Sequence, residues 1–301
     1  MTTLTDVANI VDLDGRDWAH VSRTFQALRF DFAVRTDSVE VGRQLETVFG
    51  GFAPATGAGT TYSLIDEGES IQHRYRIYCD DTLLSQATTL SWSIAVLLQN
   101  VNQQVISRSS ADLVLLHAAG AERNGVGVVL PAPMECGKTT TVSGLLRRGF
   151  RYLTDEAVAI DPATLLVQPF PKALSIDRGS WPVLPDFEPP PPRLVLDQWQ
   201  VPPSAIRPDL VSGPVLPRLF VLPRYQAGVR TALEPLSRAK TLMALVECTF
   251  EFPGQPRRNL ETLGRVLAGC DCYRLDIGNL DQAVDLISGL VDDVTMEERT
   301  A

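Results

Sequence analysis

The segment from Val126 to Thr140 constrains the fold more than any other part of the chain. It starts with the apolar run Val126–Leu130, continues through the loop 131–137 and reaches Lys138-Thr139-Thr140 where a helical pattern begins. An apolar strand, a loop ending in Gly-Lys-Thr and a following helix form the pattern of a phosphate-binding loop, usually written G-x-x-x-x-G-K-[ST]. In such a loop, backbone N–H groups and the helix N-terminus converge on phosphate oxygens. The segment therefore predicts an α/β architecture built around a nucleotide-binding loop.

The loop residues divide into groups with different expected roles. The predicted nucleotide-binding residues are Met134, Glu135, Cys136, Gly137, Lys138, Thr139 and Thr140. Lys138 would place a point charge on the β- and γ-phosphates of ATP, and the Thr139 hydroxyl suits Mg²⁺. The loop departs from the usual pattern because Ala132 replaces the first glycine, and because Pro133 and Glu135 stand where small residues are common. The alternative hypothesis is that the Gly-Lys-Thr sequence stands at a helix start by chance and binds no nucleotide.

An acidic pair and a histidine are the other candidates for chemistry. Asp155-Glu156 follows the extended run Arg151–Thr154, 17 positions after Lys138. We expect a parallel strand beside the loop strand, which would bring both carboxylates to the γ-phosphate. One carboxylate would accept a hydroxyl proton, and the other would hold Mg²⁺ directly or through water. His117 is predicted to end the apolar run 113–116. An acidic turn and a structural histidine are the corresponding alternatives.

Periodicity divides the chain into residues 1–108 and 109–301. The first region shows a mixed α/β pattern in which no group of residues suggests chemistry. Its expected elements are strands at Leu28–Arg35, Thr61–Ile65 and His73–Cys79, and helices at Ser38–Phe49 and Ser91–Ser107. In the second region Asn124-Gly125 predicts a tight hairpin turn, and Gly149 predicts the end of the helix Thr139–Arg148. Further expected elements are strands at Ala157–Ile160, Leu219–Leu222, Arg230–Pro235 and Cys272–Leu275, and helices at Arg238–Cys248, Asn259–Leu267 and Leu280–Val291.

A proline-rich segment interrupts the second region. Residues 182–217 contain 11 of the 21 prolines. This density argues against a helix or a central strand, because proline lacks the N–H that both need. We expect a long ordered excursion or a mobile loop next to a site, which either shapes an acceptor cleft or only covers the core.

Composition excludes several classes of partner. The formal net charge is −9, so a broad surface for nucleic acid or for anionic lipid is not expected. No apolar run approaches the roughly 20 residues of a membrane span. The five cysteines are irregularly spaced, and the first residues lack the features of a secretory signal, which together predict a cytoplasmic protein. Phosphate recognition must then be local, and Mg²⁺ supplies a large share of the charge neutralisation.

Several of these segments together resemble one known family. The chain resembles the catalytic domain of HPr kinase/phosphorylase in five segments, which are Leu116-His117, Gly127–Leu130, Cys136–Thr139, Arg148–Phe150 and Tyr152–Glu156. They are especially similar to the shorter HPr-kinase-like proteins found beside peptide-modifying gene sets, which Gln168–Lys172 and Tyr273–Asp276 also fit. The resemblance covers about residues 110–292. It implies a mixed sheet with covering helices, as in HPr kinase and PEP carboxykinase, and a smaller N-terminal α/β region of the variable kind.

The resemblance also implies an activity. Members of this family transfer a phosphoryl group from ATP·Mg²⁺ to a hydroxyl, usually of serine; for this chain the acceptor would be a peptide, a protein or a small molecule. The resemblance implies Lys138 and the loop amides as phosphate ligands, Asp155 as the general base and Thr139 with Glu156 as the Mg²⁺ ligands. His117 would orient or polarise the site. The sequence departs from the family in having Glu156 where the family has Asp, and a loop with fewer glycines.

Two other functions remain open at this point. Ala132, Pro133 and Glu135 fit a nucleotide-binding regulatory or scaffold protein without efficient catalysis. A weaker alternative is that the loop binds another phosphorylated ligand or none. The sequence does not decide whether the chain forms a homo-oligomer. Further candidates for charge stabilisation, each of a type more often found as a solvated surface residue, are Lys172, Arg178, Arg193, Arg224, Arg257 and Arg258.

Overall fold

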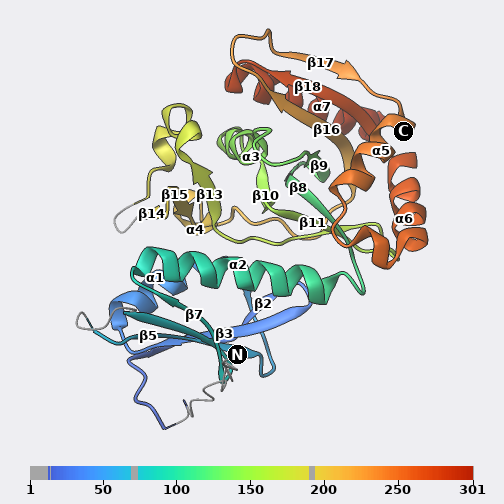
Figure 1. Cartoon of the computed structure of the whole chain (residues 1–301). Coiled ribbons are helices and arrows are strands. Elements are labelled where there is room, and N and C mark those ends of the chain that lie inside the picture. The colour runs from blue at the N-terminus through green and yellow to red at the C-terminus, as the bar shows by residue number, and fades with distance from the viewer. Residues whose placement is uncertain (1–12, 14, 69–73, 190–193, 301) are drawn as a thin grey trace, which may run out of the picture.

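The computed structural model describes residues 13, 15–68, 74–189 and 194–300. Two sheets dominate the structure (Figure 1), a large one built from the second half of the chain and an N-terminal one built from the first. Helices cover both faces of the large sheet. This arrangement confirms the predicted α/β class.

The large sheet has a mixed topology that gathers strand ends at one edge. Its order is β12-β11-β8-β9-β16-β18-β17, with β10 also paired to β8. The strands are β8 Val114–Arg123, β9 Val126–Pro131, β10 Arg151–Thr154, β11 Ala157–Ile160, β12 Val167–Gln168, β16 Pro217–Tyr225, β17 Ala232–Pro235 and β18 Asp271–Ile277. β9, β16 and β18 are parallel neighbours. Their carboxyl ends therefore lie at one edge, the usual place for a ligand in an open α/β sheet.

Strand β8 is longer than the apolar run predicted. It spans ten residues, so His117 lies inside the strand, and the expectation that His117 ends it was wrong. The small residues after His117 are buried within the sheet. A Cβ at Gly120 would lie 3.3 Å from Val158 Cγ2, so a small residue is needed for close packing. The hairpin to β9 turns at Asn124-Gly125, both at positive φ, as predicted.

The neighbours of β10 differ from the expectation. β10 pairs antiparallel with β8, not with the loop strand β9. It still runs in the direction of β9, because β8 is antiparallel to both strands. The length of β8 gives it an edge on which β10 and β11 both pair, one after the other. Asp155 and Glu156 therefore lie at the break between these two strands.

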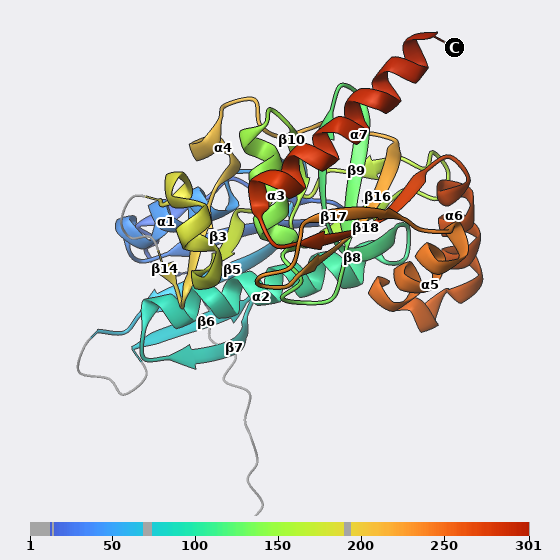
Figure 2. The ribbon, with the colours of Figure 1, turned by 90° about the horizontal axis from the view of Figure 1, so that it is seen from above.

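Two helices cover each face of the large sheet. α3 Lys138–Arg147 and α7 Leu280–Thr300 pack together on one face, where Val142, Leu145 and Ile287 join the core. α5 Arg238–Cys248 and α6 Pro256–Ala268 contribute Leu245 and Leu263 to the core of the other face. Figure 2 shows the C-terminal part of α7 projecting past the sheet. α3 ends at Arg147, and Gly149, two residues further on, has a φ of 85°, which confirms the predicted stop.

The proline-rich segment forms short ordered elements. β13 Leu174–Asp177 precedes it, and the segment contributes η1 Arg178–Val183 in part, η2 Pro185–Phe187, β14 Leu194–Val195, β15 Gln198–Val201 and α4 Pro203–Ile206. β15 is the central strand of the small sheet β13-β15-β14. The expectation of neither a helix nor a central strand was therefore wrong, since α4 is a short helix with proline in its first turn. The reason is that the prolines lie on both sides of residues 194–201, which contain none.

The N-terminal sheet has the order β4-β2-β3-β5-β6-β7, with β1 paired to β3. Its elements are β1 His20–Val21, β2 Phe25–Ala27, β3 Phe30–Thr36, α1 Val39–Phe49, β4 Ala53–Pro54, β5 Thr60–Asp66, β6 Tyr75–Cys79, β7 Thr82–Ala87 and α2 Leu90–Ser109. Ser38 and Thr89 cap the two helices through their side chains. Strand β7 was not predicted, since its sequence has no clear alternation. The predicted strand at 73–79 began at His73, which lies outside the described residues.

The N-terminal sheet and the large sheet share one hydrophobic core. Figure 1 shows α2 running along the boundary between them. Phe52 stacks on Phe170 with ring centroids 5.5 Å apart, and Ala157 and Ala173 belong to the same buried cluster. Gly51 lies so close to Pro171 that a Cβ there would be 2.1 Å from the Pro171 carbonyl oxygen. The N-terminal region thus packs directly beneath residues 170–173.

We expect Gly51→Ala to lower the free energy of unfolding by about 1–3 kcal/mol, because the added methyl must push the Pro171 backbone away. Urea denaturation measures this loss. Gly57→Ala is the matched control, since a Cβ at Gly57 meets nothing within 4 Å. Equal stabilities of the two variants would contradict this packing between the N-terminal region and residues 170–173.

Candidate functional site

The Gly-Lys-Thr loop, residues 132–139, links the end of β9 to the start of α3 in a tight curve. Gly137 is at a φ of 86° and Glu135 at 62°. Glycine adopts such values freely, whereas the left-handed conformation costs a residue such as Glu about 1 kcal/mol. The curve brings the buried Lys138 back over its own loop, where Nζ donates to the carbonyl oxygens of Ala132 at 2.9 Å and Pro133 at 2.6 Å.

The charge of Lys138 is only partly balanced by its surroundings. Burial lowers its pKa, and this effect exceeds the opposite influence of Cys136, Cys248, Glu156 and Asp155. A desolvated ammonium gains from an anionic partner more than a solvated one does. The loop therefore holds a cation that favours an anionic ligand.

Asp155 connects the loop helix to two strands. Its carboxylate is buried, and Oδ1 accepts a hydrogen bond from Tyr152 Oη at 2.8 Å. Oδ2 accepts from the Ser175 backbone N–H at 3.1 Å and from Thr139 Oγ1 at 3.5 Å. Lys172 Nζ lies 3.0 Å from Oδ1. Both carboxylate oxygens are thus engaged by the protein itself.

Lys172 belongs to this site as its second buried cation. Burial alone would lower its pKa, but Asp155 and Glu156 outweigh burial and raise it. Nζ also donates to Ser175 Oγ at 3.1 Å and lies 3.9 Å from Glu156 Oε2. The sequence suggested Lys172 only as one of six basic candidates. A stronger signal for Lys172 is its position as the one charged residue of the otherwise apolar run Phe170–Leu174.

Glu156 lies at the break between β10 and β11, and His117 lies on the neighbouring strand β8. The Glu156 side chain is 35% exposed. Burial raises its pKa and Asp155 adds to the rise, against the opposite influence of Lys172 and Lys138. His117 pairs with Ala157 in the β8–β11 register, and its ring lies 5.8 Å from that of Phe250. Burial and the charge of Lys138 lower the pKa of His117 to about 4. The imidazole is therefore neutral at neutral pH.

The predicted loop residues do not all face the same space. Five of the seven line a cavity of about 560 Å³, namely Glu135, Gly137, Lys138, Thr139 and Thr140. The Met134 side chain is 80% exposed, so only its backbone can contribute to a ligand site. Cys136 is half-buried and close enough to Lys138 to influence its pKa. Thr140 Oγ1 lies 2.6 Å from Ser180 Oγ, which ties α3 to η1 across the cavity.

The remaining basic candidates lie elsewhere. Arg178 pairs with Asp197 at 2.5 Å, and Arg257 with Glu261 at 2.8 Å on the surface of α6. Arg258 donates to backbone carbonyls at the end of α2 and just after it, so its role is structural. Arg224 is exposed on β16. Arg193 lies outside the described residues.

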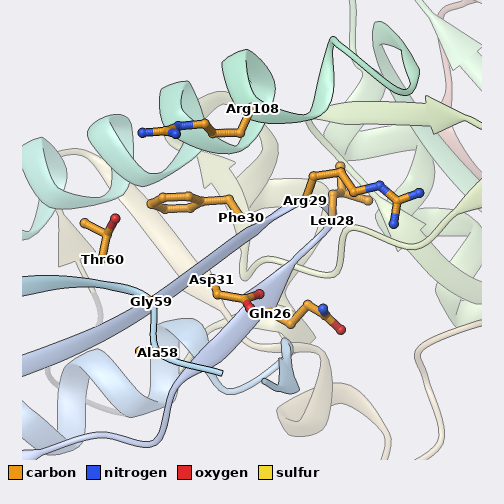
Figure 3. Close-up of a pocket in the computed structure, with 9 residues that line it drawn as sticks. All are labelled: Gln26, Leu28, Arg29, Phe30, Asp31, Ala58, Gly59, Thr60 and Arg108. Atoms are coloured by element: carbon orange, nitrogen blue, oxygen red, sulfur yellow. The ribbon is translucent and has the colours of Figure 1, made fainter. Parts of the chain in front are cut away.

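A second cavity, of about 430 Å³, lies on the N-terminal sheet (Figure 3). Arg108 extends from α2 past the Phe30 ring, whereas Arg29 points away from it. Arg29 already lies 3.4 Å from Asp112. None of the residues that line this second cavity lines the cavity beside the loop, so the two cavities are separate.

Oxygen donors next to the loop fit a magnesium ion. Thr139 offers a hydroxyl, and Asp155 and Glu156 offer carboxylates, the ligand types that Mg²⁺ prefers. Among the described residues no three His, Cys, Asp or Glu side chains form a cluster able to hold a metal. One or two protein oxygens are enough to bind Mg²⁺ when substrate phosphates supply other ligands.

Comparison with known proteins does not identify a family. No protein-family model matches the chain, and no curated protein matches its sequence. No helix in the described parts of the chain has the length and apolar character needed to cross a membrane.

The low pKa of His117 predicts a pH-dependent stability. The unfolded chain binds a proton on this side chain near pH 6.5, whereas the folded chain excludes it down to about pH 4. Stability is thus expected to fall as the pH falls through this window, by about 2–3 kcal/mol from His117 alone. Urea denaturation from pH 7 to 4 should show a smaller loss in His117→Gln than in the wild type. Parallel pH profiles would contradict the assignment.

Proposed function

We propose that this chain is an ATP- and Mg²⁺-dependent phosphotransferase of the HPr-kinase-like kind. It transfers the γ-phosphoryl group to a hydroxyl, of serine type, on a peptide, a protein or a small molecule. The observation that carries the proposal is the meeting of Lys138, Thr139, Asp155 and Glu156 at the carboxyl end of β9. Lys138 and Thr139 line the cavity, whereas Asp155 contacts Thr139 from outside the cavity lining and Glu156 is its neighbour in sequence. A cation, a hydroxyl and carboxylates are the groups that phosphoryl transfer requires.

The loop would hold the phosphates by charge and by backbone amides. The first N–H groups of α3 have no partner within the helix, and the helix dipole favours negative charge at this end. Lys138 would exchange its two loop carbonyls for phosphate oxygens. With a net charge of −9 for the chain, these local groups have to supply most of the attraction.

The two carboxylates differ in ways that favour different roles. Asp155 is buried, and both of its oxygens are engaged by protein donors that include the Thr139 hydroxyl, so we assign it to position Thr139, which would hold Mg²⁺. Glu156 is more exposed and has a raised pKa, so we assign it as the acceptor of the substrate proton. This division reverses the roles that the family resemblance implies.

In the proposed reaction the acceptor hydroxyl oxygen forms a bond to the γ-phosphorus. Its proton passes to a Glu156 carboxylate oxygen, and the bond between the γ-phosphorus and the bridging oxygen breaks, so that ADP leaves. Lys138 offsets negative charge on the phosphoryl oxygens. Mg²⁺, when bound, neutralises the β- and γ-phosphates. Neutral His117 orients the acceptor, and the buried ion pair with Lys172 holds the Asp155 carboxylate in place.

A second function is favoured by one specific observation. Glu135 lines the cavity with a negative charge and holds a strained left-handed conformation. An anionic side chain at this point opposes phosphate binding. A regulatory or scaffold protein that binds nucleotide without efficient transfer would tolerate such a residue.

The proposed setting for either function is the cytoplasm, since all five thiols are free.

Transfer from γ-labelled ATP to candidate acceptors, followed by mass spectrometry, tests the assignment. We expect Glu156→Gln to lower the transfer rate by at least a hundredfold with ATP affinity within about threefold of wild type, because general base catalysis contributes 10²–10⁴. Asp155→Asn should instead raise the Mg²⁺ concentration needed for half-maximal binding of ATP. Asp161→Asn, on an exposed turn after β11, is the control.

The outcomes separate the alternatives. A wild-type rate of phosphoryl transfer in Glu156→Gln would show that Glu156 is not the general base. Tight ATP binding without transfer to any acceptor would favour the regulatory or scaffold function. Unchanged ATP binding in Lys138→Ala would contradict nucleotide binding by this loop.

A further inference from the structure

The cavity beside the Gly-Lys-Thr loop extends well beyond the space that phosphates need. It has a volume of about 560 Å³, within the roughly 300–1,000 Å³ typical of small-molecule sites. The loop residues line one part of it. The other walls come from η1, from the end of β16 and from the residues between β18 and α7. A phosphate chain bound at the loop would leave these walls uncovered.

Two of the apolar side chains on these walls are largely exposed to solvent. Val183 is 46% exposed and Tyr225 is 57% exposed, and both line the cavity together with Ile277 and Leu280. Large apolar side chains left open around a concave surface mark ligand sites. The aromatic ring of Tyr225 offers a flat face on which a base can stack.

Tyr225 also lies next to the phosphate end of the cavity. Its Cβ would be 3.4 Å from a Cβ built at Gly137, so the residue packs directly against the loop. The pairing of Tyr225 with Ile277 in the parallel β16–β18 register fixes this position. A nucleoside joined to phosphates in the loop would therefore lie close to Tyr225.

Polar groups supply the rest of what a nucleoside needs. Asn279 Oδ1 caps α7 by accepting a hydrogen bond from the Gln282 N–H at 3.0 Å, so the amide nitrogen is the end available to a base acceptor. Asp177 and Ser180 add a carboxylate and a hydroxyl on the η1 side of the cavity. Groups of this kind hydrogen-bond sugar hydroxyls.

We propose that this part of the cavity is a nucleoside subsite, in which Tyr225 stacks on the base and Asn279 contacts its edge. The inference rests on the proposed function, because it places the remainder of the nucleotide whose phosphates the loop would hold. It adds that much of the affinity comes from the nucleoside. Glu135 and Asp177 make the cavity less attractive to a bare polyphosphate than the loop alone would be.

Calorimetric titration with ATP and with inorganic tripolyphosphate, both with Mg²⁺, tests the subsite. We expect the wild type to bind ATP at least tenfold more tightly than tripolyphosphate. Tyr225→Ala should weaken ATP binding about tenfold, since stacking on an aromatic ring contributes about 1–3 kcal/mol per base. Its tripolyphosphate affinity should stay within twofold, and Tyr225→Phe should bind ATP as the wild type does.

Met243→Ala is the control, because Met243 is a similarly exposed apolar side chain on α5. Thermal melting checks that every variant folds. Equal affinities for ATP and tripolyphosphate, with no effect of Tyr225→Ala, would overturn the nucleoside subsite and leave the phosphate site standing. Binding of neither ligand by the wild type would overturn the proposed function and the subsite with it.

Discussion

The buried ion pair between Lys172 and Asp155 is the interaction on which the rest of the site depends. Asp155 Oδ1 lies 3.0 Å from Lys172 Nζ, and both side chains are almost fully buried. A buried carboxylate without a partner is strongly destabilising, so each group requires the other. The pair joins the end of β10 to the segment before β13, and the Thr139 contact extends it to α3. One cluster thus fixes the loop helix against two strands.

The two sheets support this pair from different sides. The large sheet brings the carboxyl ends of β9, β16 and β18 to one edge, where the loop and the cavity lie. The N-terminal region packs Phe52 against Phe170, two residues before Lys172. Residues 1–108, which suggest no chemistry from sequence, therefore help to set the position of the buried lysine. This gives the N-terminal region a structural role in the site.

Local patterns predicted the local elements well. Apolar periodicity predicts the strand and helix within residues 126–147, and Gly137 and Gly149 mark the loop and the helix end. Apolar periodicity also predicts the helix Arg238–Cys248. Strand order could not be predicted in the same way, because the pairing of β10 with β8 depends on contacts between distant residues. Lys172 shows the same limit, since its burial depends on Phe170 packing against the N-terminal sheet. Sequence therefore indicated the loop, whereas the arrangement of its partners required the fold.

A double-mutant cycle on unfolding free energy tests the central ion pair most directly. It compares Lys172→Met, Asp155→Asn and the double variant with the wild type in urea denaturation at pH 7. Each single variant is expected to lose about 3–5 kcal/mol, because it leaves one buried charge unpaired. The double variant should lose less than the sum of the two by at least about 2 kcal/mol. Losses that add to within about 0.5 kcal/mol would contradict the account.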